Sequence, residues 1–338
     1  MPDTDPAAST SEPSSRTMRA AYLTGHGGNE VVSVGPRPLP ERRRGEVRVR
    51  MVAATLNRVD LYMRDSGAGI THRLPQVMGL DGAGIVDAVD DDEPLLTLGQ
   101  RVLLHPGLGC GRCEFCRRGE GVLCTSARLL GEHRDGTLAE YVTLPAANVF
   151  AMPPGLDFAE AAALGVNHLT AWRMLVGKAR LQPWETVLIF GVGGGVSLAA
   201  LQLARALGAR TIVTSRDDDK LARALALGAD HAVNGARQDV AREVQALTGG
   251  RGVDVVFENV GAAVWSAALK SLVRGGRLVT CGATTGDCQL APVWGLGAGI
   301  VKYTSYFHFM NATRGPDVHG NDYGGYNYNL LTVWGDID

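Results

Sequence analysis

The hydrophobic pattern of the chain changes near residue 150. Before that point, apolar residues occur in short runs, and residues 47–52 (VRVRMV) alternate apolar with basic side chains, which predicts a strand with one face in solvent. Residues 79–89 (GLDGAGIVDAV) place glycines among β-branched residues, as bulges and sharp bends require. Residues 140–144 indicate another strand. Residues 18–150 are therefore expected to form a compact, mostly β domain.

After residue 150, strand patterns alternate with amphipathic helix patterns. Residues 185–190 (ETVLIF) predict a buried strand, residues 197–208 a helix that ends at a glycine, and residues 211–215 a second strand. This alternation is typical of a parallel sheet with helices on both faces. We therefore expect residues 151–290 to form a doubly wound α/β domain.

The two ends of the chain lack these patterns. Residues 1–17 are rich in Pro, Ser, Thr and Asp, have no apolar run, and predict a disordered leader. Residues 291–338 are rich in Gly, Asn, Tyr and His, and form a divergent C-terminal segment in which the pattern places no elements.

The charge balance and the length of the apolar runs limit what the protein can bind. The 338 residues include 33 Lys and Arg against 35 Asp and Glu, so a net charge of −2 provides no general attraction for nucleic acid or for an anionic membrane. No segment carries enough consecutive apolar residues to span a bilayer. We expect a cytoplasmic protein that acts on a small-molecule substrate.

Four of the six cysteines fall within residues 110–124, which read CGRCEFCRRGEGVLC. Thiolates two residues apart can converge on one tetrahedral ion, and four sulfur ligands leave no open position. The alternative is a pair of disulfides, but no secretory signal accompanies the cysteines. The sequence predicts one structural zinc ion held by Cys110, Cys113, Cys116 and Cys124.

A glycine-rich turn joins the strand at 185–190 to the helix that follows it. In this context the helix N-terminus offers free N–H groups to a pyrophosphate, and Ser197 stands where a glycine or alanine usually allows helix and strand to approach. The alternative is a glycine turn that binds nothing. The turn residues expected to contact a dinucleotide are Gly191, Gly193, Gly194, Gly195, Val196 and Ser197.

The end of the second strand bears on the choice of cofactor. Enzymes that use NAD commonly have a carboxylate there, whereas this chain has Ser215 and Arg216, which can accommodate a 2′-phosphate. Lys220 adds a second cation, and the acidic residues 217–219 weigh against the argument. We favour NADPH over NADH. Asn259 ends a later strand and is expected to flank the cofactor.

Together these motifs resemble the medium-chain dehydrogenase/reductase superfamily. The resemblance covers about residues 18–286 and includes NRVDLYMR (57–64), GLDGAGIV, the four-cysteine lobe, HLTAWRML and IFGVGGGVSLAALQLARALGA. It implies an α/β protein with a GroES-like mostly-β catalytic domain and a Rossmann doubly wound parallel-sheet domain. It also implies that the end of the chain returns to the catalytic domain and contributes to a homodimer contact, a pattern that residues after Gly286 do not show.

Zinc alcohol dehydrogenases of this superfamily hold a second, catalytic zinc. At the matching positions this chain has Asn57, Leu80 followed by Asp81, and Asn167, which supply neither a thiolate nor an imidazole. The chain therefore resembles the quinone oxidoreductase branch, with the structural zinc lobe retained.

Without a Lewis acid, hydride transfer to a quinone or an enone is easier than reduction of an isolated carbonyl. The resemblance assigns Asn57 and Tyr62 to substrate polarisation, Thr170 to the nicotinamide ring or its ribose, and His168 to proton donation. The alternative for His168 is a histidine bonded to backbone near a helix start. Asp60 and Asp81 are expected to orient neighbouring groups. Two other functions stay open: a zinc-dependent alcohol dehydrogenase, and a non-redox or non-enzymatic NADPH-binding protein of a biosynthetic pathway.

Overall fold

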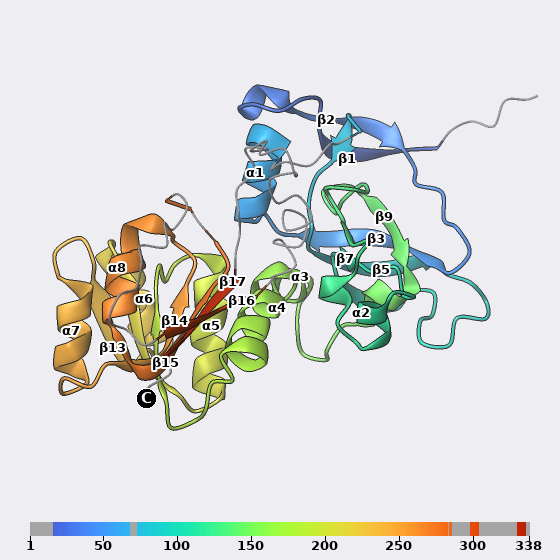
Figure 1. Ribbon diagram of the computed structural model, residues 1–338. Helices are drawn as coiled ribbons and strands as arrows, with labels where there is room; N and C mark the ends of the chain where they lie inside the picture. Colours follow the sequence, from blue (N-terminus) through green and yellow to red (C-terminus); the bar gives the residue numbers. More distant parts are fainter. Residues whose placement is uncertain (1–15, 68–72, 283, 286–297, 304–329, 336–338) are drawn as a thin grey trace, which may run out of the picture.

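The computed structural model describes residues 16–67, 73–282, 284–285, 298–303 and 330–335, which form two domains (Figure 1). The expected leader and most of the C-terminal segment lie outside this part of the chain. No helix among the described residues is long and apolar enough to cross a membrane.

The first domain is built on two antiparallel sheets. A five-stranded sheet has the order β10-β6-β5-β3-β9, and a three-stranded sheet has the order β2-β1-β4. Residues 47–52 lie in β3, where Val47 and Val49 are buried in the core and Arg48 points outward to pair with Asp87 at 2.6 Å. The elements are β1 (Thr17–Leu23), β2 (Val32–Pro38), β3 (Glu46–Ala54), α1 (Arg58–Ser66), β4 (Gln76–Val77), β5 (Gly82–Ala88), β6 (Arg101–Leu104), β9 (Tyr141–Pro145) and β10 (Val149–Ala151).

The cysteine-rich segment forms a small lobe on this domain. Two short strands, β7 (Gly107–Leu108) and β8 (Arg128–Leu129), pair at its base, and α2 (Glu114–Arg117) lies within it. The pairing of β7 with β8 therefore brings the two ends of the cysteine-rich loop together.

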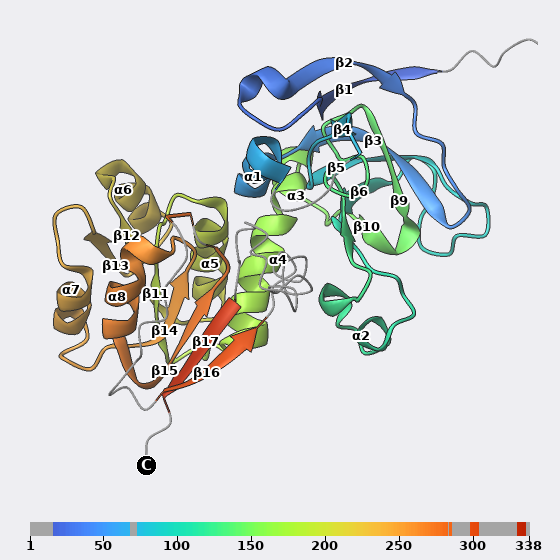
Figure 2. The same cartoon turned by 45° about the horizontal axis from the view of Figure 1, so that its top comes forward.

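The second domain is a seven-stranded sheet in the order β13-β12-β11-β14-β15-β17-β16 (Figure 2). Strands β13 to β15 are parallel, and apolar clusters on the two faces pack against α5 and α6 on one side and against α7 and α8 on the other. The expected Rossmann arrangement is confirmed. Its elements are β11 (Thr186–Ile189), α5 (Gly195–Ala206), β12 (Arg210–Ser215), α6 (Asp218–Ala226), β13 (His231–Asn234), α7 (Val240–Leu247), β14 (Val253–Glu258), α8 (Ala262–Lys270) and β15 (Leu272–Thr280).

The described part of the C-terminal segment joins this second sheet. Strands β16 (Ala298–Tyr303) and β17 (Leu330–Gly335) pair with each other, and β17 pairs antiparallel with β15. The sequence pattern did not predict these two strands.

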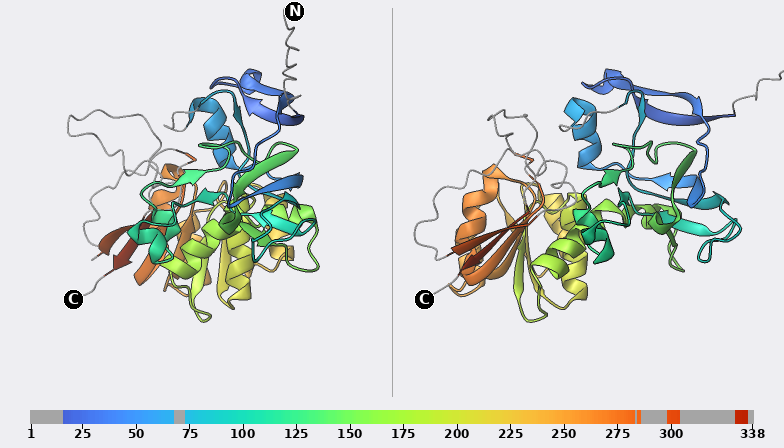
Figure 3. Two further views of the ribbon diagram at one scale, coloured as in Figure 1. Left: turned by 90° about the vertical axis from the view of Figure 1, so that its right-hand side faces the viewer. Right: turned by 45° about the vertical axis from the view of Figure 1, so that its right-hand side comes forward.

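Two helices connect the domains (Figure 3). Helix α3 (Phe158–Ala163) packs on β5 and β3 of the first domain. Helix α4 (Val166–Trp172) packs on α5 of the second domain and continues into a π-helical stretch, Arg173–Lys178. Residues 164 and 165 therefore lie where the chain passes from one domain to the other.

Candidate active site

A cleft of about 1270 Å³ runs between the two domains. The first domain contributes residues around the start of α1, and the second contributes the glycine turn, the carboxyl ends of β12 and β14, and one side of α8. Of the residues expected to act in catalysis or cofactor binding, the cleft brings together Asn57, Tyr62, Thr170, Gly191, Gly193, Gly194, Gly195, Val196, Ser215, Arg216, Lys220 and Asn259.

The glycine turn has the backbone that a pyrophosphate site requires. Gly191 and Gly193 have φ angles of 67° and 122°, which side-chain-bearing residues rarely adopt. Ser197 is fully buried beneath the turn and does not line the cleft. Its Oγ donates to the Phe190 carbonyl at 2.7 Å and accepts from Asn259 Nδ2 at 3.0 Å. Ser197 therefore supports the turn and holds Asn259.

Two of the three acidic residues after β12 are committed to local bonds. Asp217 caps α6 by accepting the N–H groups of residues 219 and 220 at 2.9 and 3.2 Å. Asp218 accepts from Asn234 Nδ2 at 2.7 Å and from Arg237 at 2.6 Å. Arg216 and Lys220 are exposed in the cleft, and a Cβ on Gly193 would lie 2.7 Å from Lys220 Cδ. This end of the cleft thus carries two cations beside Ser215, of which Lys220 has its Nζ 3.8 Å from Asp217 Oδ2.

Glu258 shapes the loop that carries Asn259. Its carboxylate is fully buried, accepts the Val260 and Gly261 N–H groups on one oxygen, the latter at 2.6 Å, and accepts Thr280 Oγ1 at 2.8 Å on the other. Burial raises the pKa of Glu258 to about 7 despite these bonds.

Asn57 is the N-cap of α1 and is tied to two acidic residues. Its backbone N–H donates to Asp60 Oδ2 at 2.7 Å, and its Nδ2 donates to Asp81 Oδ2 at 2.8 Å. Asp60 is buried, which raises its pKa to about 6. The Asn57 amide nitrogen is thus directed to Asp81, and Tyr62, further along α1, also lines the cleft.

The structure does not bring His168 to the cleft. Its Nδ1 lies 3.2 Å from the Ala163 carbonyl and its Nε2 lies 3.1 Å from Gln202 Oε1. This geometry matches the alternative of a histidine bonded near a helix start, and we do not retain His168 as proton donor. Sequence reasoning also missed Arg58, an exposed cation that lines the cleft next to Asn57. Its position at the first residue of α1 was the available signal.

The sulfur atoms of Cys110, Cys113, Cys116 and Cys124 all lie within 4.8 Å of one another. No disulfide joins these cysteines. Backbone N–H groups point at the sulfur atoms, from residue 110 to Cys124 Sγ at 3.2 Å and from residue 113 to Cys110 Sγ at 3.4 Å. Four converging thiols with N–H donors fit a closed zinc site. Elsewhere in the described part of the chain, no other group of three or more His, Cys, Asp or Glu converges in this way.

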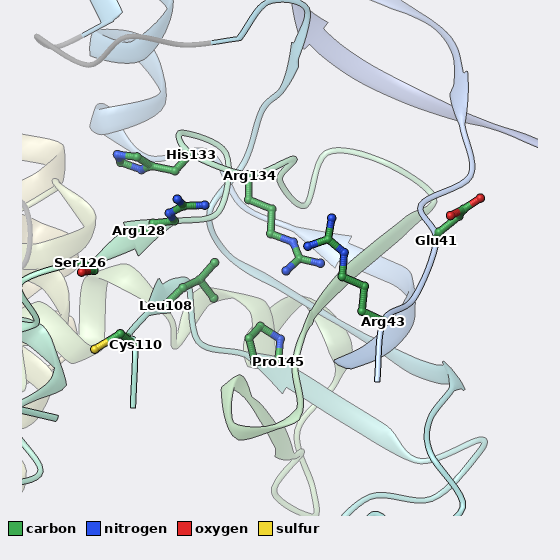
Figure 4. Close-up of a pocket in the computed structure, with 10 residues that line it drawn as sticks. Glu41, Arg43, Leu108, Cys110, Ser126, Arg128, His133, Arg134 and Pro145 are labelled. Carbon is green, nitrogen blue, oxygen red and sulfur yellow. The ribbon is translucent and has the colours of Figure 1, made fainter. Parts of the chain in front are cut away.

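A second, smaller cavity of about 490 Å³ lies beside the cysteine lobe (Figure 4). Arg43, Arg128 and Arg134 line it, and Arg134 forms a two-pronged ion pair with Glu46 at 2.7 and 3.0 Å. It shares no lining residue with the cleft between the domains, so it is separate from the candidate active site.

Comparison with known proteins places the chain in a family. Residues 43–154 match the alcohol dehydrogenase GroES-like domain, and residues 195–306 match the zinc-binding dehydrogenase family. Sorbitol dehydrogenase of Bacillus subtilis is 32% identical over 79% of this chain and 75% of its own, and quinone oxidoreductase of Lama guanicoe is 32% identical over 82% and 76%. A crystal structure of an NAD-dependent alcohol dehydrogenase is 45% identical, with a TM-score of 0.78 over 82% of this chain and 80% of that one.

These relatives are oxidoreductases, and the domains that they share with this chain are those that form the cleft and the cysteine lobe. The shared domains and the cysteine cluster indicate a nicotinamide cofactor and zinc. The chain is an oxidoreductase that belongs to the medium-chain dehydrogenase/reductase superfamily.

Proposed function

We propose that this protein is an NADPH-dependent reductase that transfers hydride to a quinone or to an enone-type double bond without a catalytic metal. The observation that carries the proposal is the composition of one cleft. Its cofactor end presents Ser215, Arg216 and Lys220, and its substrate end has Asn57 where relatives that use zinc have a ligand.

Different residues of the cleft bind different parts of the cofactor. The N–H groups at the start of α5 receive the pyrophosphate, and Arg58 on the opposite wall adds a positive charge. Arg216 and Lys220 would neutralise a 2′-phosphate, with one oxygen of Asp217 capping α6 and the other 3.8 Å from Lys220 Nζ. We assign Thr170 and Asn259, which also line the cleft, to the nicotinamide half of the cofactor.

NADPH supplies a hydride from C4 of its nicotinamide ring. When hydride adds to a quinone or to the β-carbon of an enone, negative charge develops on the acceptor oxygen. We assign to the Tyr62 phenol, which lines the cleft, a hydrogen bond to that oxygen, and to Asn57 the positioning of the N-terminus of α1 through its bond to Asp81. The product is completed by a proton from this phenol or from water.

The cofactor preference is tested with Arg216→Ser. A charge-assisted hydrogen bond contributes about 1.5–3 kcal/mol, so KM for NADPH should rise about 10- to 150-fold while KM for NADH changes little. Arg237→Ser is the matched control, since Arg237 pairs with Asp218 and does not line the cleft. Equal effects of the two variants on NADPH, or a wild type that prefers NADH, would contradict the assignment.

A second candidate function is a zinc-dependent alcohol dehydrogenase, which the names of the relatives favour. Metal analysis separates the two, because the cysteine lobe accounts for about one zinc per chain and a catalytic zinc would raise the count to about two. A third is a non-redox NADPH-binding protein. Tight NADPH binding without NADPH oxidation across a panel of quinones and enones would favour that function.

A further inference from the structure

The Asp81 carboxylate is fully buried and accepts three hydrogen bonds from two separate segments. Asn57 Nδ2 donates to Oδ2 at 2.8 Å, and Thr55 Oγ1 donates to the same oxygen at 3.0 Å. The backbone N–H of Val166 donates to Oδ1 at 2.8 Å. One side chain thus joins the segment before α1 to the first residue of α4.

The contact with α4 depends on a glycine. A Cβ atom on Gly165 would fall well inside van der Waals contact of Asp81 Oδ1 and Cγ. The space beside the carboxylate therefore excludes a side chain at this position. The glycine lets the carboxylate reach the free N–H at the start of α4.

The segments that Asp81 joins form two walls of the cleft. On one side, Asn57 and Tyr62 belong to the substrate wall. On the other, Val166 is followed by Asn167, whose side chain packs against Gly195, with a Cβ on that glycine placed only 2.6 Å from Asn167 Nδ2. A short path of contacts therefore runs from α1 through Asp81 and α4 to the glycine turn.

We propose that Asp81 is a positioning residue that fixes the distance between the substrate wall and the cofactor turn. The proposal rests on the proposed function, because it assigns Asp81 to the hydride-transfer geometry of the same cleft.

The competing role for Asp81 is purely structural, as a buried polar group that stabilises the fold. Three variants separate the two roles. Gly165→Ala displaces the carboxylate from α4, and Asp81→Asn leaves acceptors for at most two of the three donors. Thr55→Val is the matched control, because it removes one bond to the same carboxylate but Thr55 does not line the cleft.

The three variants and the double variant Gly165→Ala with Asp81→Asn are compared by kcat/KM with NADPH and a quinone, and by thermal unfolding. We expect Gly165→Ala and Asp81→Asn each to lower kcat/KM by between about tenfold and 100-fold, as misplacement of reacting groups does. Thr55→Val should stay within about threefold of wild type. Both changes act through the bond between the Val166 N–H and Asp81. The double variant should therefore lose no more kcat/KM than the more impaired single variant.

Two results would overturn the proposal. One is an Asp81→Asn enzyme with kcat/KM within about twofold of wild type. The other is a loss of kcat/KM that follows thermal stability across all three single variants, Thr55→Val included, since that is what a structural role predicts.

A measurement that does not require turnover keeps this test apart from the proposed function. Amide hydrogen exchange at Val166 should be slow in the wild-type chain and faster in Gly165→Ala and Asp81→Asn, and NADPH binding followed by fluorescence should weaken in both. If wild type reduces no quinone or enone, the proposed function fails. Unchanged exchange and unchanged NADPH affinity in the variants would then refute the positioning role on its own.

Discussion

Glu132 offers a direct test of the electrostatics beside the candidate active site. Its side chain is only 2% exposed, and its Oε2 lies 3.9 Å from Nδ1 of His133, whose pKa burial lowers to about 4. Burial, with a smaller contribution from the charge of Asp60, raises the pKa of Glu132 from 4.5 to about 8. The carboxyl is therefore mostly protonated in the folded protein at pH 7 and ionised in the unfolded chain.

The sign of the pH dependence follows from this difference. Between pH 4.5 and pH 8 the native state binds one more proton at Glu132 than the unfolded state, so its contribution to stability is present at low pH and is lost as pH rises. Each pH unit in this window changes the free energy of unfolding by about 1.4 kcal/mol, which amounts to about 3 kcal/mol by pH 7. Glu132→Gln keeps the shape of the side chain and removes the titration.

We expect the free energy of unfolding of Glu132→Gln, relative to wild type, to rise by about 1.4 kcal/mol per unit between pH 5 and pH 8. Urea unfolding followed by circular dichroism at several pH values measures this difference. Glu41→Gln is the control, because Glu41 is exposed. Parallel curves for Glu132→Gln and wild type over the whole range would refute the reasoning.

Two further predictions concern the cysteine lobe and the turn. Mass spectrometry of the purified protein should find about one zinc per chain. Cys113→Ser should lose that zinc, and the unfolding temperature of the first domain should fall. Full zinc retention in the variant would contradict the four-thiolate site. Ser197→Ala removes the hydroxyl that bonds the Phe190 carbonyl and Asn259 Nδ2. The free energy of unfolding should fall by about 1–3 kcal/mol, and KM for NADPH should rise. An unchanged KM would show that the position of Asn259 does not depend on Ser197.

Periodicity and spacing predicted the fold because both are local properties. The alternation in residues 47–52 places Val47 and Val49 in the core of the first domain, and the strand, glycine turn and helix at 185–208 form β11 and α5. The cysteines at 110–124 converge because their spacing is short. In contrast, β16 and β17 pair across a long sequence separation, and no alternation in the Gly-rich tail indicated them.

The sequence predicted the role of a site residue only where that role depends on neighbours in the same segment. The glycine-rich motif predicted a tight turn, and Gly191 and Gly193 have the positive φ angles of such a turn. His168 has the chemistry of a proton donor, but its ring is turned toward Ala163 and Gln202 by the packing of α4 on α5, which a sequence pattern does not encode. The three bonds to Asp81 come from residues 26, 24 and 85 positions away, so only the folded chain reveals them.

Three carboxyl groups, those of Asp60, Asp81 and Glu132, are buried near the start of α1. Burial raises the pKa of Asp60, Asp81 and Glu132 alike, so desolvation outweighs the hydrogen bonds at each of them. Asp81 offsets part of that cost with three hydrogen-bond donors and Asp60 with the N-terminus of α1, whereas burial raises the pKa of Glu132 to about 8. The donors of Asp81 come from the segment before α1 and from the start of α4, which is why we propose the positioning role for this carboxylate.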